Sequence, residues 1–218
     1  MTNLKVVIPV RAGSQRVKNK NFKNFAGKSL LEIKIEQVKS LNVDDIIVNT
    51  DSELAIEIAK NQNVSFHRRE SYYASSECSG SEYFENLAKV TESKHILIAP
   101  VTAPFIMPDA YEMAINTYFN ANCNSLMSVK IIKEFLWHNG HAVNYDPSNA
   151  PNSQDLPKYL APTFGLILAE RKAMLESKNV ICSNPLFHEV SDIEAIDIDT
   201  DLDFEFAEFL YNKFYSNA

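Results

Sequence analysis

The fold is decided by the stretch LKVVIPVRAGSQR, residues 4–16. Its first seven residues form an apolar run, broken only by Lys5, that is typical of a buried β-strand. The small residues Ala12, Gly13 and Ser14 then predict a tight turn leaving that strand. Because ligands bind beyond the carboxyl ends of strands in parallel sheets, this turn is the first place to expect a site.

Strand and helix patterns alternate along the rest of the chain. Further strands are expected at 45–50, 64–68, 95–99, 125–131, 164–169 and 195–198, and helices at 29–41, 53–61, near 171–177 and at 202–214. Ser52 and Asp109 occupy positions suited to helix N-caps, the latter beside Pro108. This alternation predicts an α/β fold, a Rossmann-like three-layer sandwich with a mostly parallel sheet.

We expect one domain over residues 1–218, interrupted by an excursion at 133–162. That segment is rich in Asn, Pro, His and aromatic residues and contains Asn139-Gly140, a strong hairpin-turn signal. A structureless loop of this length is uncommon in a compact domain. We therefore expect a β-hairpin that either covers the site or docks onto a partner subunit.

Composition excludes several classes of protein. The net charge of −7 argues against a nucleic-acid partner, and the apolar runs are too short to span a membrane. The N-terminus lacks a secretory pattern, and the three cysteines suggest neither disulfides nor a zinc site. We expect a cytoplasmic protein, and the net charge is still compatible with a small anionic substrate, because a few local cations suffice to bind one.

A basic turn follows the first strand. Its four cations lie between positions 11 and 20 of an otherwise acidic chain: Arg11, Arg16, Lys18 and Lys20. Backbone N–H groups of such a turn converge on an anion, although a solvated basic loop is the alternative. Gly27-Lys28-Ser29 is not a Walker A loop, because Phe22 stands where its first Gly should be.

Near the other end stands the acidic run IDIDTDLD, residues 196–203. On a strand, Asp197 and Asp199 point to the same side, where a divalent cation between them relieves their repulsion. Asp201 and Asp203 instead suit the N-terminus of the last helix. Two further motifs each have two interpretations. Thr50-Asp51 either contacts a nucleotide or caps a helix. Arg68-Arg69 binds either a ligand or surface carboxylates.

Together these segments resemble the cytidylyltransferases that activate acidic sugars, the acylneuraminate, legionaminate, pseudaminate and Kdo-activating enzymes. The similarity is carried by residues 8–16, Lys20-Asn21, 27–30, 50–52, Arg69 and 196–204. It implies transfer of CMP from CTP to an acidic sugar with release of pyrophosphate, a Mg²⁺ cofactor, and a homodimer with a swapped hairpin. The implied catalytic residues are Arg11, Lys20 and Asp199, the nucleotide-binding ones Arg11, Ala12, Gly13, Ser14, Lys20, Asn21, Arg69 and Ser79, and the metal ligands Asp197 and Asp199.

The acceptor half departs from this pattern. Pro100 and Ile106 replace the Gln and Arg of sialate-activating members, and no Arg stands near Pro162. Such losses remove charge-assisted bonds to a carboxylate. Three alternatives stay open: a transferase for a phosphorylated or phosphonate acceptor, a non-catalytic nucleotide-binding subunit, and a sugar-phosphate uridylyltransferase. Other acceptor contacts are then expected among Lys130, Lys133, His138, Gln154, Asp155 and Lys158.

Overall fold

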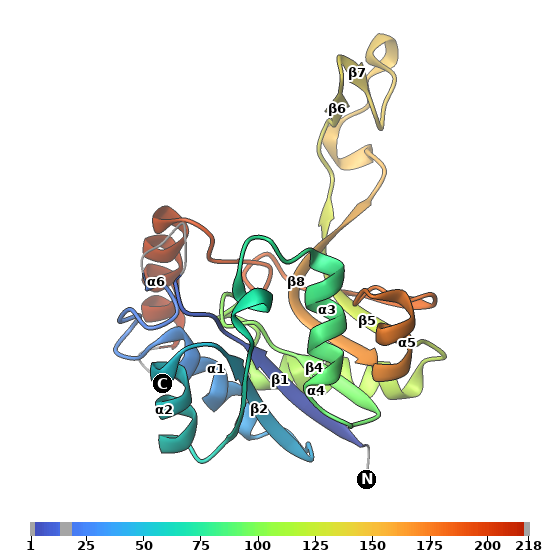
Figure 1. Ribbon diagram of the computed structural model, residues 1–218. Helices are drawn as coiled ribbons and strands as arrows, with labels where there is room; N and C mark the ends of the chain where they lie inside the picture. Colours follow the sequence, from blue (N-terminus) through green and yellow to red (C-terminus); the bar gives the residue numbers. More distant parts are fainter. Residues whose placement is uncertain (1–2, 14–18, 216–218) are drawn as a thin grey trace.

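Strand β1 (Leu4–Pro9) runs through the middle of the molecule, paired in parallel with a strand on each side (Figure 1). The computed structural model describes residues 3–13 and 19–215. Over these ranges the main sheet has seven strands in the order β3-β2-β1-β4-β8-β5-β9. The other strands are β2 (Asp45–Thr50), β3 (Ser65–Arg68), β4 (His95–Ile98), β5 (Ser125–Ile132), β8 (Tyr159–Glu170) and β9 (Pro185–Glu189).

Most strand pairs are parallel, as the strand–helix alternation predicts. The exception is β8, which runs antiparallel to both β4 and β5. β8 follows the excursion, whose hairpin returns the chain beside β5 without a helical crossover, and this connection makes the pairing antiparallel. The expected three-layer α/β sandwich with a mostly parallel sheet is confirmed.

Helices cover both faces of the sheet. They are α1 (Leu30–Lys39), α2 (Glu53–Asn61), α3 (Gly80–Lys89), α4 (Pro108–Asn120), α5 (Arg171–Ser177) and α6 (Asp201–Tyr215). Ser29 begins α1 with a capping box to Glu32, and Ser52 caps α2 as predicted. Within the described ranges, no helix is both long and apolar enough to cross a membrane.

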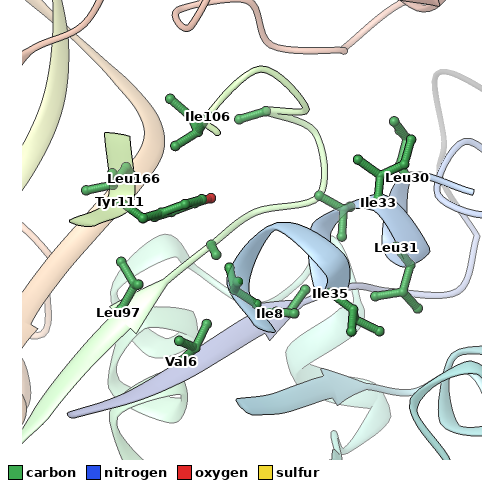
Figure 2. Packing of buried hydrophobic residues seen from close by; sticks show 14 of the residues in the cluster. Val6, Ile8, Leu30, Leu31, Ile33, Ile35, Leu97, Ile106, Tyr111 and Leu166 are labelled. Atoms are coloured by element: carbon green, nitrogen blue, oxygen red, sulfur yellow. The ribbon is translucent and has the colours of Figure 1, made fainter. Parts of the chain in front are cut away.

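The alternating side chains of β1 join two separate cores. Val6 and Ile8 lie in the larger cluster, with side chains from α1 and with Tyr111 of α4 (Figure 2). Phe204 and Ala207 of α6 belong to the same cluster. Val7 points to the opposite face, where the smaller cluster packs beneath α3 and α5. Because both faces of β1 are covered, a nearly continuous apolar sequence is what this position requires.

The excursion forms an arm that projects from the body of the molecule (Figure 1). Pairing of β5 with β8 continues into its base, as far as Ile132 opposite Tyr159. At its tip β6 (Trp137–His138) and β7 (His141–Ala142) form the hairpin predicted at Asn139-Gly140. Both turn residues have positive φ, 49° and 79°, which Asn and Gly tolerate best.

Two predictions about the elements are wrong. Residues 195–198 form no strand: after a turn, Ile198 N donates to Thr102 O, outside any ladder. The sheet gains β9 in its place, an edge strand beside β5. Asp109 does not cap α4, because Met107 holds the N-cap position, Pro108 fills the first turn and Asp109 lies within it.

Candidate functional site

A cavity of about 480 Å³ opens where the carboxyl ends of β1 and β4 meet the start of α3. It lies where a parallel sheet places ligands. The lining residues come from widely separated segments: Pro9, Val10, Arg11, Lys20, Asn21, Arg69, Tyr73, Ala74, Ser75, Cys78, Gly80, Tyr83, Phe84, Leu87, Ile98, Pro100, Val101, Thr102, Phe164 and Ile167.

The turn after β1 is braced from two sides. Ala12 N donates to Asp51 Oδ1 at 2.8 Å, and Asn21 Nδ2 donates to Arg11 O at 3.2 Å. Arg11 itself donates from Nη1 to Ala74 O at 3.2 Å, across the cavity mouth. Asp51 therefore shapes this turn, and the amide of Ala12 already has an acceptor.

Gly13 continues this turn with φ +68°, a conformation that side chains disfavour. Ser14, a predicted nucleotide contact, lies outside the described residues, as do Arg16 and Lys18. The roles of Gly13 and Ser14 stay predictions.

Lys20 joins the two ends of the chain. Its buried ammonium donates to Ile198 O and lies 3.9 Å from Asp199 Oδ1. Ile198 is fully buried, whereas Asp197 is exposed and Asp199 half-exposed. Although this segment is no strand, the buried Ile198 leaves the two flanking aspartates solvent-accessible. Neither is among the lining residues of the cavity, and Asp199 is connected to it through Lys20, which is one of them.

The second half of the acidic run lies at the N-terminus of α6, as the sequence predicts. Asp203 Oδ2 accepts from the amide and hydroxyl of Thr200, at 2.7 and 2.8 Å, and so begins α6. Asp203 also accepts from Asp199 N at 3.1 Å, which orients the backbone of the residue before the cap. Asp201 lies in the first turn of the helix, where a negative charge favours its dipole.

Arg69, not Arg68, belongs to the cavity. Its side chain is buried; Nε donates to Asn49 Oδ1 at 2.6 Å and Nη2 to Asn49 O at 2.7 Å. The guanidinium carbon lies 5.4 Å from the ring centroid of Tyr83, whose pKa is raised by burial. Arg68 pairs with Glu53 at the exposed surface, which is the second of the two interpretations of this dipeptide. Ligand binding by Arg69 stays a prediction.

Other candidate residues have local structural contacts. Ser79 begins α3, accepting from Glu82 N at 3.3 Å and donating to Glu82 Oε2 at 2.6 Å, and it is not among the lining residues. Its contact with cytidine stays a prediction. Thr50 Oγ1 accepts from Ser52 N, and Lys28 pairs with Glu36, in keeping with the rejection of a Walker A loop.

The lining of the cavity divides by chemistry into two groups of residues. The apolar group, called the apolar end below, includes Phe84, Leu87, Ile98, Pro100 and Phe164. Among the described residues, the cations that line the cavity are Arg11, Lys20 and Arg69, and together with Asn21 they are called the polar end.

The departures from the sialate-activating pattern fall in different places. Pro100 lines the cavity wall, but Ile106 is fully buried in the larger core and lines no part of it. The six alternative acceptor contacts, all on β5 or the arm, do not line the cavity either: Lys130, Lys133, His138, Gln154, Asp155 and Lys158.

Several residues of the site escape sequence reasoning. Tyr83 and Phe84 are examples, since no motif marks them. A signal did exist for α3: Ser79 followed by Glu82 is a capping-box pattern ahead of an amphipathic segment. It predicts the helix that carries Tyr83 and Phe84 into the cavity.

A family model described as "Cytidylyltransferase" matches residues 5–213. The chain is 25% identical over 232 residues to a pseudaminic acid cytidylyltransferase of Campylobacter jejuni, and the match covers 100% of both chains. It is 24% identical to N-acylneuraminate cytidylyltransferase B of Danio rerio, a match over 93% of this chain and 50% of that protein.

Solved structures share the fold. One is a CMP:2-keto-3-deoxy-manno-octonic acid synthetase complexed with CTP, with TM-score 0.71 and 16% identity, covering 96% of this chain and 98% of the other. Another is a 4-diphosphocytidyl-2C-methyl-D-erythritol synthase from Anaerococcus prevotii, with TM-score 0.70 and 14% identity over the same shares.

Proposed function

We propose the function of this chain from the premise that it belongs to the cytidylyltransferase family, and is therefore a nucleotidyltransferase. The chain transfers CMP from CTP to an acidic sugar of the nonulosonate type and releases pyrophosphate. The observation that carries the proposal is the contact of Lys20 with Ile198 and Asp199. This contact joins the basic turn to the acidic run at one cavity.

The nucleotide is assigned to the polar end of the cavity. Arg11 and Lys20 face the phosphates there, while Asn21 and Arg69 face the base. Asn21 Oδ1 is buried and has no hydrogen-bond partner among the described residues. A buried acceptor of this kind favours a donor, which the amino group of cytosine supplies and the O4 atom of uracil does not. This difference supports CTP over UTP.

The residues at the metal position fit Mg²⁺. Asp197 and Asp199 offer carboxylate oxygens, the ligands this ion prefers, and Lys20 already places one positive charge near Asp199. Within the described residues no group of three or more His, Cys, Asp or Glu side chains forms a complete metal site. Phosphate oxygens of CTP would supply the further ligands that such a pair needs. When bound, Mg²⁺ supplies Lewis-acid polarisation of the phosphate.

The chain's own part in the reaction is positioning and charge neutralisation. An acceptor oxygen attacks the α-phosphorus of CTP in line, a new P–O bond forms, and the bond to pyrophosphate breaks. Arg11 and Lys20 stabilise the negative charge that grows on pyrophosphate as it leaves. The hydroxyl proton of a sugar acceptor passes to a base, whereas an ionised phosphonate needs none, so the pH profile separates the two acceptor classes.

The arm supports a homodimer. It exposes large apolar side chains, including Phe135 (42%), Trp137 (56%), Val143 (49%) and Leu160 (49%), on a segment with well-formed internal hydrogen bonds. Such side chains are stabilised by a partner surface. In this proposal a second copy of the chain provides the partner surface. Light scattering on the purified protein measures its mass in solution, and a monomeric mass contradicts the homodimer. The reaction itself belongs in the cytoplasm, which suits three free thiols.

Pyrophosphate release tests the function. The protein is assayed with CTP or UTP and Mg²⁺ beside pseudaminic, legionaminic, N-acetylneuraminic and 3-deoxy-manno-octulosonic acids, and beside phosphorylated and phosphonate compounds. We expect release with CTP and an acidic sugar. Pyrophosphate release only with a phosphonate or phosphorylated compound assigns the acceptor to the alternative class. Equal use of UTP and CTP contradicts the assignment of the nucleotide. No release with any acceptor contradicts the proposed catalytic activity.

A further inference from the structure

Lys34 of α1 is a buried cation outside the site. Its side chain is fully buried among apolar neighbours of the larger core. Nζ donates to Ala103 O at 2.8 Å and to the hydroxyl of Tyr111 at 2.9 Å, and it lies 5.1 Å from the centroid of the Tyr111 ring. Neither partner is a carboxylate, and the structure gives Lys34 no salt bridge to any residue it describes.

A buried ammonium without a counterion is costly. Its charge is removed from water and only neutral dipoles replace the lost hydration. Burial accordingly lowers the pKa of Lys34 to about 7, and burial raises the pKa of Tyr111, so its hydroxyl stays protonated. An apolar residue of similar length fills the same space without this cost. Residues that break such a rule are found most often where function requires them.

Gln37 extends the same contact by one turn of α1. Its Nε2 donates to Pro104 O at 2.6 Å, so two successive carbonyls, those of Ala103 and Pro104, are held by side chains three residues apart on one helix face. Figure 2 shows the neighbouring packing, with Tyr111 and Ile106 lying across from the α1 residues Leu30 and Ile33. The loop between β4 and α4 is therefore fastened to α1 by polar bonds inside an apolar core.

The other side of this loop forms the site. Pro100, Val101 and Thr102 line the cavity. Thr102 O accepts from Ile198 N at 2.9 Å, and Ile198 O accepts from Lys20 Nζ. A continuous path of covalent and hydrogen bonds thus runs from Lys34 through Ala103 and Thr102 to the segment that carries Asp197 and Asp199.

We propose that Lys34, assisted by Gln37, is a positioning residue: it fixes the loop of residues 100–106, and through Thr102 it sets where the acceptor wall and the aspartate pair lie relative to bound CTP. The inference rests on the proposed function and adds a determinant to that site. Lys34 touches neither substrate, so its removal should alter acceptor use and turnover and spare CTP binding. A displacement of the reacting groups by a fraction of an ångström is enough to slow a transfer reaction markedly.

The test compares Lys34→Met with wild type in pyrophosphate release with CTP, Mg²⁺ and pseudaminic acid, or with the acid of the panel that wild type uses best. We expect kcat to fall about 10-fold and KM for the acid to rise, with the Kd for CTP from calorimetry unchanged within about two-fold. Lys34→Gln, which keeps a donor, should recover part of the loss. The matched control is Lys39→Met on the exposed side of the same helix, where Nζ donates to Gln62 Oε1.

Each outcome has one meaning. Suppose that the wild type is active. The inference is then overturned, and the proposed function left intact, if Lys34→Met has the same kinetics as wild type. The same holds if CTP binding by Lys34→Met is weakened as much as its turnover. A wild type that releases no pyrophosphate overturns the proposed function itself. If Lys34→Met does not fold, Gln37→Leu decides: a fall in kcat of about three-fold at unchanged CTP affinity supports the positioning role, and unchanged kinetics overturn it.

Discussion

The two ends of the cavity are built in different ways. At one end Arg11, Lys20, Asn21 and Arg69 are fixed by hydrogen bonds to backbone and to neighbouring side chains. At the other end the walls are largely apolar, and the only polar bonds that hold the loop of residues 100–106 from α1 come from Lys34 and Gln37, within the described structure. In the proposed function this difference corresponds to the two substrates, with the nucleotide at the polar end and the acceptor at the apolar one.

The largest expected effect comes from the acidic run that Lys20 contacts. Asp199→Asn should lower pyrophosphate release by about 10³-fold or more, because it removes a charge from the metal position, and should leave the melting temperature nearly unchanged since Asp199 is half-exposed. Asp201→Asn, in the first turn of α6, is the matched control and should keep its activity. Full turnover in Asp199→Asn removes this residue from the mechanism.

The second-largest effect is expected at the polar end of the cavity. Arg11→Ala should lower kcat/KM for CTP by about 10²-fold, the usual scale for losing a charged contact to a developing anion. Arg68→Ala removes an equally basic but exposed side chain, paired with Glu53, and should change the rate by less than about two-fold. Steady-state kinetics with both variants decide the point: equal rates in Arg11→Ala and wild type assign Arg11 to a solvated loop.

The free energy of unfolding should depend on pH through Lys34. The folded-state pKa of Lys34 is lowered to about 7 from an ordinary value of 10.5. Between these values the unfolded chain holds a proton that the folded chain lacks, so the contribution of Lys34 to the free energy of unfolding rises with pH, by up to about 1.4 kcal/mol per unit. Below about pH 7 that contribution is constant and least favourable.

Urea unfolding of wild type and Lys34→Met at pH 7.5, 8.5 and 9.5 measures this slope. Lys34→Met lacks it, so the stability of wild type relative to the variant should increase at each step. Parallel profiles contradict the burial of an uncompensated charge at this position.

The smallest effect sharpens the acceptor assignment. Pro100→Gln restores the residue of the sialate-activating pattern at a position that lines the cavity wall. One new hydrogen bond should raise kcat/KM for N-acetylneuraminic acid about five-fold, without a change in KM for CTP. Competition between this acid and pseudaminic acid measures the shift. A larger change in KM for CTP than in acceptor use contradicts the division of the cavity into two ends.

Most of the polar end could be predicted from sequence because that part is local, whereas Arg69 comes from the distant segment after β3. Residues 4–13 specify a strand and a tight turn by themselves, and Arg11 stands within that short stretch. Lys20 and Asn21 follow directly, so their place near the turn needs no knowledge of the rest of the fold. The capping role of Asp203 was predictable for the same reason, since Thr200 stands three residues before it.

The apolar end could not be predicted because it is assembled from distant segments. Phe84 of α3, Pro100 after β4 and Phe164 of β8 meet only through the sheet order, and each alone is typical of an ordinary core. The error at residues 195–198 has a related cause. Alternation of apolar and acidic residues predicts a strand, but Ile198 N is satisfied by the loop carbonyl of Thr102, so no ladder forms.

The most direct test is a crystal structure of the protein with CTP and Mn²⁺, with the metal located by its anomalous scattering. The account predicts the triphosphate beside Arg11 and an anomalous peak at the carboxylates of Asp197 and Asp199, next to the α-phosphate. A nucleotide bound elsewhere, or a metal peak remote from both aspartates, contradicts the claim that the two ends of the chain build one site.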